Sequence, residues 1–357
     1  MGESIIKGRG AQFNGKNKFL KHFQVPEKSA EYRAALDEWE VEKTETQFFK
    51  EHPKKIVNKV ASPDVGAAFS INPYQGCEHG CIYCYARNSH QYWGYSAGLD
   101  FESKIIIKES APELLVKHLE NPKWIPASIM LSGNTDCYQP IERKKQLTRK
   151  MLEVFLEYRH PVGIITKNSL ILRDLDLLKQ LAEMDLVHVM VSVTTLDEDI
   201  RRKLEPRTAS GKNRLRVVEE LANNKVPVGV MTAPIIPGLN DSEIPAILRE
   251  AGARGARSAG YTIVRLNGEI AGLFTDWARK HYPDRADKML NQIADCHNGK
   301  LNDSRFGTRM RGEGHLAGMI KQLFTINKRR YIHSDPPFKY NFSLFRRKRQ
   351  GQLDLFG

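Results

Sequence analysis

Between about residues 66 and 265, short apolar runs alternate with stretches whose apolar residues recur at helical spacing. The runs with strand character lie at about 128–132, 162–166, 187–194, 226–232 and 260–265. The stretches with helical spacing lie at 141–158, 173–184, 212–224 and 241–251. Strands that alternate with helices form parallel sheets, because each helix carries the chain back to the same edge. The pattern therefore predicts an α/β core.

The segments on either side of this core have a different pattern. Residues 27–49 show helical periodicity with mixed charge, and we expect residues 1–65 to be an N-terminal extension packed on the core at 66–265. Residues 266–327 read as a helical C-terminal extension, and residues 328–357 as a basic tail. The expected apolar anchors of the helical extension are Trp277, Met289, Ile293, Met319 and Phe324.

Three of the five cysteines, Cys77, Cys81 and Cys84, fall within eight residues at the spacing C-x3-C-x2-C. A disulfide framework would not crowd three thiols into one loop. Three protein ligands with one open position suit a metal centre that binds a small molecule. The spacing favours an iron–sulfur cluster, and zinc remains the alternative.

The N-terminal 25 residues carry five Lys or Arg residues and no apolar segment typical of a signal peptide. No run of about 18 apolar residues is present, so a membrane span is not expected. We therefore expect a cytoplasmic protein with reduced thiols and no membrane partner.

The cysteine loop resembles the signature of the radical S-adenosylmethionine (radical SAM) superfamily, C-x3-C-x-aromatic-C, with Tyr83 at the aromatic place. The resemblance implies a [4Fe–4S] cluster on the three cysteines and S-adenosylmethionine (SAM) bound at the open iron. In that family SAM is cleaved to a 5′-deoxyadenosyl radical, which abstracts hydrogen from a substrate. The resemblance also implies a partial (β/α)6 TIM-like barrel and an electron donor such as flavodoxin or ferredoxin.

Polar motifs follow several predicted strands, and active sites of such barrels lie at those ends. One resembles the glycine-rich motif that meets the methionine amino group of SAM, and it comprises Ser132, Gly133, Asn134, Thr135 and Asp136. Ser192 and Thr194 end the fourth strand, and Glu205-Pro206-Arg207 follows, where relatives place polar contacts to ribose and carboxylate; Arg207 is the expected contact. Ile236 and Gly238 match the I-x-G-x-x-D pattern whose backbone lies against adenine. Taken singly, these are turn glycines, core hydroxyls or a surface cation; together with the cysteines they favour a SAM site.

The phrase Thr135-Asp136-Cys137-Tyr138-Gln139-Pro140-Ile141-Glu142, with residues 72–76 and 96–101, resembles a bacterial branch of Rv2578c-type proteins related to spore photoproduct lyase. That lyase repairs a UV thymine dimer by hydrogen abstraction. The resemblance suggests the hypothesis that Cys137 returns a hydrogen atom to a substrate radical. The alternative is a small buried thiol.

The positive charge of the chain suggests a class of substrate. The net charge is +13, and residues 305–349 contain twelve Lys or Arg residues against two acids, Glu313 and Asp335. Such density is typical of phosphate binding, although charge runs are often solvated tails. Aromatic residues after the cysteine loop offer either base stacking or loop packing: His90, Tyr92, Trp93 and Tyr95. DNA is the favoured substrate, in lesion repair.

The last residues resemble the bacterial sliding-clamp-binding pentapeptide: Gln352, Leu353, Asp354, Leu355 and Phe356. Such a peptide places Leu355 and Phe356 in an apolar pocket of the clamp. A tether of this kind would concentrate a weak DNA binder near replicating DNA.

Two other functions remain open from the sequence. One keeps the radical chemistry but changes the substrate to RNA or protein. The other is a non-catalytic, DNA-associated metal protein that senses redox state. Fold likeness alone does not choose among substrates.

Overall fold

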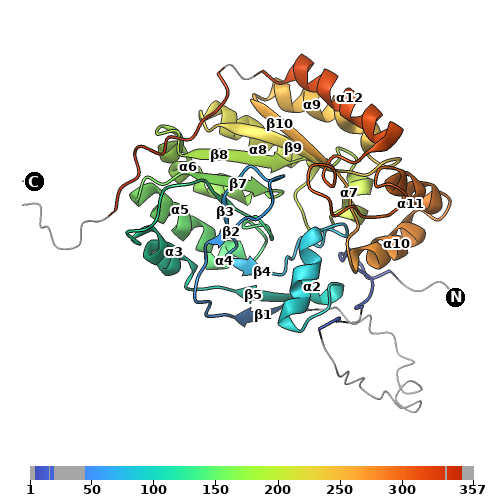
Figure 1. The fold of residues 1–357 in the computed structure, drawn as a ribbon, viewed down its shortest axis with the longest axis horizontal. Coiled ribbons are helices and arrows are strands. Elements are labelled where there is room, and N and C mark those ends of the chain that lie inside the picture. Colours follow the sequence, from blue (N-terminus) through green and yellow to red (C-terminus); the bar gives the residue numbers. More distant parts are fainter. Residues whose placement is uncertain (1–4, 16, 20–44, 334–335, 348–357) are drawn as a thin grey trace, which may run out of the picture.

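The computed structural model describes residues 5–15, 17–19, 45–333 and 336–347 (Figure 1). Its main sheet has seven strands in the order β10-β9-β8-β7-β6-β3-β2. Their bounds are β2 (Asn58–Lys59), β3 (Phe69–Ile71), β6 (Ile129–Leu131), β7 (Val162–Thr166), β8 (Val187–Ser192), β9 (Val228–Ile235) and β10 (Ser258–Ile263). The six strands from β3 to β10 pair in parallel, and β2 adds an antiparallel edge. The prediction of a partial barrel is confirmed.

Helices follow the strands, and most of them cover the outer face of this sheet (Figure 1). Their bounds are α3 (Ala111–Leu119), α4 (Glu142–Lys145), α5 (Leu147–Glu157), α6 (Leu175–Ala182), α7 (Glu198–Leu204), α8 (Gly211–Asn223) and α9 (Ile244–Ala253). Of these, α4 lies beside a smaller sheet, and α7 lies beside helices of the C-terminal extension (Figure 1). The single helix expected over 141–158 is two helices, because Gln146 adopts a left-handed φ of 53° between them. The apolar stripes of these helices pack on buried β-branched residues of the strands, such as Val189 and Val230.

A second, smaller sheet joins β1 (Gln47–Lys50), β5 (Lys104–Ile107) and β4 (Tyr74–Gln75) in that order. The helical periodicity read over 27–49 is wrong at its C-terminal end, because residues 47–49 form β1 and pair in parallel with β5. Residues 27–44 of that expectation lie outside the described residues. The backbone hydrogen bonds that β5 offers outweigh a weak local helical preference.

The cysteine loop lies between β4 and β5, together with the 3₁₀ helix η1 (Tyr85–Trp93) and α2 (Leu99–Ser103). Two further 3₁₀ turns, η2 (Ser169–Asp174) and η3 (Asp241–Glu243), precede α6 and α9. Both turns follow carboxyl ends of barrel strands, so they border the same edge as the cysteine loop.

The C-terminal extension contains α10 (Ile270–His281), α11 (Ala286–Asp295) and α12 (Gly314–Tyr331). Trp277, Met289 and Ile293 pack in one apolar cluster with Ile82 and Tyr83 of the cysteine loop, as anchors should. Phe324 is buried too, but Met319 is 53 % exposed and anchors nothing. Helix α12 continues through Tyr331, so the boundary expected between residues 327 and 328 falls inside a helix.

The loop between α11 and α12 ties the two ends of the main sheet together. Arg309 Nε donates to Asp64 Oδ2 at 2.6 Å, and the Gly307 amide donates to Asp64 Oδ1 at 2.7 Å. Asp64 lies between β2 and β3, while residues 307–309 follow β10. The extension therefore bridges the open side of the partial barrel through this loop.

Residues 336–347 run along the outside of the sheet rather than away from it (Figure 1). Phe338 stacks on His188 of β8, and Phe345 packs edge-on against His160 next to β7. Much of the expected basic tail is therefore a packed strap, which we call the C-terminal strap. In the described part of the chain, no helix is long and apolar enough to cross a bilayer.

Candidate functional site

The cysteine loop is held by backbone hydrogen bonds at several points. The Cys77 amide donates to the Phe101 carbonyl at 2.8 Å, and the Ile82 amide donates to the Leu204 carbonyl at 3.1 Å. Gly76 needs its positive φ of 76°, and a Cβ there would lie 2.8 Å from the Lys104 carbonyl oxygen. These constraints curl the loop over the carboxyl end of the barrel.

The three thiols of this loop are unbridged; Cys77 and Cys81 are buried and Cys84 is half-buried. Burial raises the pKa of Cys77, and the nearby charges of Asp136, Cys81 and Cys84 raise it further. Burial is also the main cause of the raised pKa of Cys81 and Cys84. Such thiols stay protonated until a metal displaces the proton. Cys84 packs against the two apolar clusters that contain Cys77 and Cys81, so the three thiols are neighbours in the structure.

Within the described ranges, no three His, Cys, Asp or Glu side chains are grouped so that they could hold a single metal ion. A compact zinc site is therefore not preformed there. A multi-iron cluster offers each thiolate a different iron, so its ligands do not converge on one point. The three thiols of the loop fit a cluster better than a single ion.

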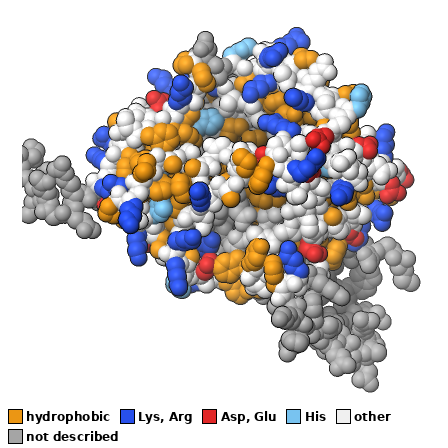
Figure 2. Space-filling view, viewed as in Figure 1, with side chains coloured by type: hydrophobic (Ala, Val, Ile, Leu, Met, Phe, Trp, Pro, Cys, Tyr) orange, Lys and Arg blue, Asp and Glu red, His pale blue; other side chains and the backbone are white. Residues whose placement is uncertain are grey.

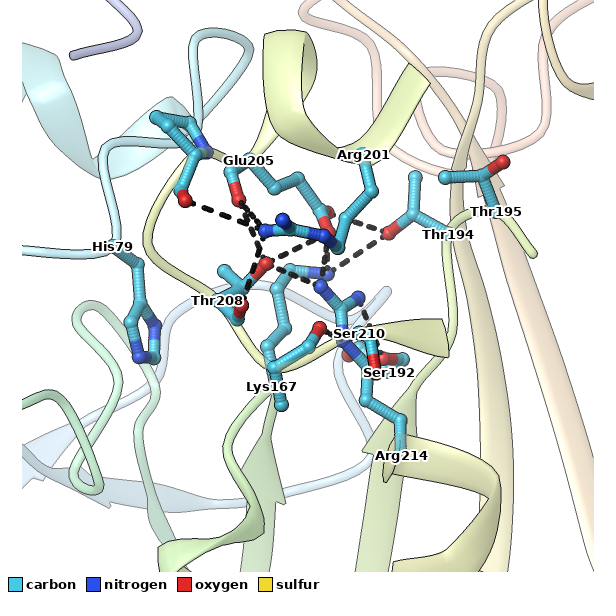
Figure 3. Close-up of polar contacts among 12 residues, drawn as sticks. His79, Lys167, Ser192, Thr194, Thr195, Arg201, Glu205, Thr208, Ser210 and Arg214 are labelled. Carbon is cyan, nitrogen blue, oxygen red and sulfur yellow. Dashed lines mark hydrogen bonds and ion pairs between the residues drawn. The ribbon is translucent and has the colours of Figure 1, made fainter. Parts of the chain in front are cut away.

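Beneath the loop lies a buried polar network centred on Glu205 (Figure 3). The Glu205 carboxylate accepts hydrogen bonds from Tyr83 Oη, from Thr194 Oγ1 at 2.7 Å and from the Arg214 guanidinium. Lys167 Nζ lies 3.4 Å from Glu205 Oε1. Burial alone would raise the pKa of Glu205, but Arg214 and Lys167 lower it well below its ordinary value. Glu205 is therefore an ionised carboxylate that fixes the aromatic residue of the cysteine motif.

Lys167 and Arg214 were not among the residues singled out from the sequence. Lys167 directly follows β7, and its ammonium group contacts Thr194 Oγ1 and the Ala233 carbonyl, each at 3.2 Å. The same rule that selected the ends of the other strands would have found it. Arg214 lies on α8, where an inward-facing arginine leaves no recognisable spacing signal in the sequence.

The segment from Ser132 to Asp136 follows β6 and is fixed by its own hydrogen bonds. Ser132 has a φ of 72°, and its hydroxyl accepts from the Cys137 amide at 2.7 Å. The amides of Asn134 and Thr135 both donate to Asn72 Oδ1, at 2.7 and 3.2 Å. A Cβ on Gly133 would lie 2.6 Å from the Ser70 Cβ, so the glycine permits close packing. The backbone of this motif is thus rigid and lies beside the cysteine loop.

Asp136 joins three parts of the site. It accepts hydrogen bonds from Thr166 Oγ1 and the Lys167 amide, each at 2.8 Å, and lies 3.4 Å from His79 Nδ1. Burial alone would raise its pKa, but His79 and the two amides of Lys167 and Tyr138 lower it. Asp136 therefore connects the end of β7 to the histidine inside the cysteine loop, and its side chain is occupied by these partners.

The turn after β9 contains Ile236 and Gly238. The Ile236 amide donates to Asn240 Oδ1 at 2.6 Å, and the Gly238 amide donates to Asp241 Oδ1 at 2.9 Å. Gly238 has a φ of 75°, and a Cβ there would lie 2.2 Å from Gln292 Oε1. Asn240 Nδ2 also donates to the Thr194 carbonyl at 2.7 Å. The ends of β8 and β9 are therefore tied into one surface.

Ser192 and Arg207 contribute chiefly through their backbones. The Ser192 carbonyl accepts from Arg214 at 3.1 Å, and the Arg207 amide donates to the His79 carbonyl at 3.2 Å. In the described part of the chain the Arg207 guanidinium makes no hydrogen bond or ion pair, but it lies near Glu78, and its positive charge acts against the rise that burial causes in the pKa of that carboxyl.

Cys137 is fully buried in the main apolar core and has no exposed surface. Its position matches the small buried thiol that the sequence offered as the alternative, and its role as a hydrogen donor remains a prediction. Among the aromatic residues, His90 is buried against Tyr95 and Phe101, and burial lowers the pKa of His90 to about 4. Tyr92 is 75 % exposed and stacks on Phe19, so base stacking stays open only for the exposed rings.

Comparisons with known proteins agree on one family. The model of the radical SAM superfamily matches residues 71–251. The uncharacterised protein Rv2578c of Mycobacterium tuberculosis is 30% identical over 236 residues, which are 65% of this chain and 69% of that protein. The uncharacterised protein MJ0683 of Methanocaldococcus jannaschii is 29% identical over 248 residues, or 70% of this chain and 88% of that one.

Among solved structures, spore photoproduct lyase complexed with dinucleoside spore photoproduct superposes with a TM-score of 0.58. The sequence identity is 14%, and the match covers 81% of each chain. At that identity the likeness concerns the fold, including the arrangement of elements around the partial barrel.

Proposed function

Since this chain belongs to the radical SAM superfamily, we propose that Cys77, Cys81 and Cys84 hold a [4Fe–4S] cluster and that the protein is a radical SAM enzyme acting on DNA. Membership of the family implies SAM and an iron–sulfur cluster. When bound, the cluster supplies the electron that cleaves SAM to methionine and a 5′-deoxyadenosyl radical. The observation that carries the proposal is the meeting of three unbridged thiols with rigid strand ends at one edge of the barrel.

The strand ends supply groups suited to each part of SAM. The Lys167 ammonium group and the Arg207 guanidinium suit the methionine carboxylate or the ribose hydroxyls. The rigid backbone at Gly133, Asn134 and Thr135 suits the amino group. The flat turn at Ile236 and Gly238 suits the adenine ring. Glu205 orients Tyr83 and holds Lys167 in place, and so acts on SAM through other residues.

A substrate with phosphate groups is supported at the mouth of the barrel. Arg265 follows β10 and is half-buried; burial and the positive charge of Arg309 lower its pKa, while Tyr85, Asp64 and Asp303 act to raise it. In the described part of the chain, no carboxylate forms an ion pair with Arg265. Phe306 is 58 % exposed, with the Arg309 guanidinium 4.4 Å from its ring centroid. An exposed ring backed by a guanidinium, at a mouth that also carries Arg265, suits a nucleotide.

Charge counted along the sequence overstates the free positive surface. Arg305 pairs with Asp303 and Glu313, and Arg309 pairs with Asp64. Lys and Arg side chains are spread over the visible face and do not form one stripe (Figure 2). The exposed basic residues of α12 remain available: Lys321, Lys328, Arg329 and Arg330.

We place this protein in the cytoplasm, with a flavodoxin or ferredoxin as electron donor.

The test is an anaerobic assay of the reconstituted, reduced protein with SAM. We expect 5′-deoxyadenosine to form in the wild type and to be absent after Cys77→Ala, Cys81→Ala or Cys84→Ala. The matched control is Cys296→Ala, since Cys296 is buried at the C-terminal end of α11, outside the cysteine loop, and its replacement should leave the product unchanged. If the protein carries a full cluster but forms no 5′-deoxyadenosine, the proposal of a radical SAM enzyme is contradicted and a redox sensor is favoured.

The substrate is tested in the same assay by adding UV-irradiated DNA, undamaged DNA or tRNA. A rise in 5′-deoxyadenosine with irradiated DNA alone supports lesion repair of the lyase type. A rise with tRNA alone would move the substrate to RNA. In the Cys137→Ala variant, 5′-deoxyadenosine formation should persist while the DNA product changes; an unchanged product would end the donor hypothesis.

A further inference from the structure

An N-terminal segment lies directly on the cysteine loop, although about 65 residues separate them in sequence. Gly10 approaches Gly80 so closely that a Cβ on Gly10 would lie 1.9 Å from the Gly80 carbonyl oxygen. Ala11 has no exposed surface and packs in the same apolar cluster as Cys81 and Tyr83. Only glycine can stand at position 10 without displacing the backbone of the loop.

Glu102 on α2 fastens this segment. Its carboxylate accepts from the Gly10 amide at 3.0 Å and from the Ala11 amide at 2.8 Å. Its backbone carbonyl accepts from Arg9 Nη1 at 2.7 Å. The Glu102 side chain is fully buried. Charge-assisted hydrogen bonds in such surroundings are stronger than neutral ones, so the segment is firmly attached.

Arg87 connects Glu102 to the cysteine loop. Its guanidinium pairs with Glu102 Oε1 at 2.5 Å and is itself fully buried. It donates to the carbonyls of Cys81 at 2.9 Å and Gly80 at 3.2 Å. Further bonds go to the carbonyls of Ala97 and Gly98, at 3.1 and 3.0 Å. Arg87 stands three residues after Cys84, so a planar fork of donors fixes the loop from within.

We propose that residues 8–11 form a clamp on the cysteine loop and that Arg87 and Glu102 are positioning residues for the iron–sulfur cluster. The clamp rests on the proposed cluster at Cys77, Cys81 and Cys84. It keeps the backbone at residues 80–81 in the conformation that presents the thiols, and it shields this side of the loop from water and dioxygen. The matched superfamily region begins only at residue 71, so the clamp lies outside it.

Outer-shell partners of metal ligands commonly change metal affinity by about 10-fold to 100-fold when they are mutated. The clamp acts on the ligand loop in the same way, through the backbone carbonyls of residues 80 and 81. Its loss should therefore release iron faster without removing any thiol. A purely structural segment would instead lower the melting temperature and leave the cluster of the folded protein unchanged.

The sharpest variant is Gly10→Ala, because it adds one methyl group against the loop and removes no hydrogen-bonding side chain. After anaerobic reconstitution of the full chain, we expect about a 10-fold or greater rise in the rate of iron release to a chelator. The electron paramagnetic resonance signal of the reduced cluster should also broaden or shift.

The matched control is Gly252→Ala. A Cβ on Gly252 would lie 2.0 Å from the Tyr331 carbonyl oxygen, so the same added atom meets a backbone oxygen between α9 and α12, away from the loop. We expect this variant to lose thermal stability but to release iron at the wild-type rate. If both variants release iron at the same rate, the proposal of a clamp is refuted, because the faster release would then reflect general destabilisation of the protein.

A second pair of variants covers the case in which Gly10→Ala fails to fold. Glu102→Gln keeps the shape of the side chain but weakens its bonds to Arg87 and to the clamp amides, and it should release iron faster. Asp174→Asn is the control, because Asp174 is an equally buried carboxylate that pairs with Arg149 and Arg173 elsewhere. Wild-type iron release from Glu102→Gln would refute the proposal. A wild type that binds no cluster would instead refute the proposed function.

Discussion

At the scale of single residues, Glu205 shows how burial and charge combine in this site. Its carboxylate has no exposed surface, and Arg214, Lys167, Tyr83 and Thr194 surround it. Because the carboxylate is fully buried, removal of its charge leaves the cations of Arg214 and Lys167 without a partner. The sequence pointed to residues 205–207, but it assigned the SAM contact to Arg207, while Glu205 makes the bonds that organise the site.

We expect Glu205→Gln to destabilise the protein by about 3–5 kcal/mol, because a buried guanidinium loses its counter-charge. SAM binding should weaken as well, since Lys167 and Tyr83 lose their common partner. Chemical denaturation and SAM titration measure the two effects. Glu198→Gln serves as the control: Glu198 pairs with Arg201 and Arg202 at 40 % side-chain exposure, so its loss should cost at most about 1 kcal/mol.

The difference in the free energy of unfolding between wild type and Glu205→Gln should depend on pH in a predictable direction. The pKa of Glu205 is lowered on folding from its ordinary value of 4.5, because Arg214 and Lys167 outweigh burial. The unfolded chain then binds a proton at a pH where the folded chain does not, so acid favours unfolding. The stabilisation is complete above the ordinary pKa and is lost as pH falls towards the folded value. The gap in stability between wild type and Glu205→Gln should therefore narrow below about pH 4.

At the scale of elements, the C-terminal strap of residues 336–347 replaces the free tail that its charge suggested. Arg347 donates to the Trp124 carbonyl at 2.6 Å, and the Arg346 amide donates to the Tyr158 carbonyl at 3.0 Å. Basic residues are often solvated, but here their donors bind carbonyls at the amino ends of the barrel strands. Phe338 and Phe345, which precede the arginines, supply packing that keeps the strap in place.

Two phenylalanines of the strap should differ in their effect on stability. Phe345 packs against the main core and His160, whereas Phe342 is 40 % exposed. We expect Phe345→Ala to lower the free energy of unfolding by about 2–3 kcal/mol, somewhat less than for a fully buried phenylalanine. Phe342→Ala should change it by no more than about 0.5 kcal/mol. Thermal or urea unfolding of the two variants decides, and equal effects would show that the strap does not hold the core.

At the scale of the whole molecule, the strap fixes the position of Arg347, the last residue that the structure describes. The peptide from Gln352 to Phe356, which is predicted to bind a bacterial sliding clamp, lies outside the described residues. The carboxyl ends of the strands, where we place SAM and substrate, face the other edge of the sheet from the strap.

We expect a peptide of residues 346–357 to bind a bacterial sliding clamp in the micromolar range, since about five residues bury little surface. The full chain should bind likewise, and the double variant Leu355→Ala, Phe356→Ala should not. The matched control is Asp354→Ala, which leaves both apolar anchors in place. Fluorescence anisotropy or calorimetry measures the affinity. If neither the peptide nor the full chain binds at high micromolar concentration, the sliding clamp is excluded as a partner.

The sequence by itself determined the cysteine loop, the alternation of strands and helices, and the polar residues at strand ends. These are local signals: a spacing, a period, or a motif of a few residues. The tertiary structure alone decided what lies between distant segments. Lys167 and Arg214 reach Glu205, Arg87 and Glu102 attach residues 8–11 to the cysteine loop, and the strap covers the sheet, since burial and charge pairing depend on neighbours that no local pattern records.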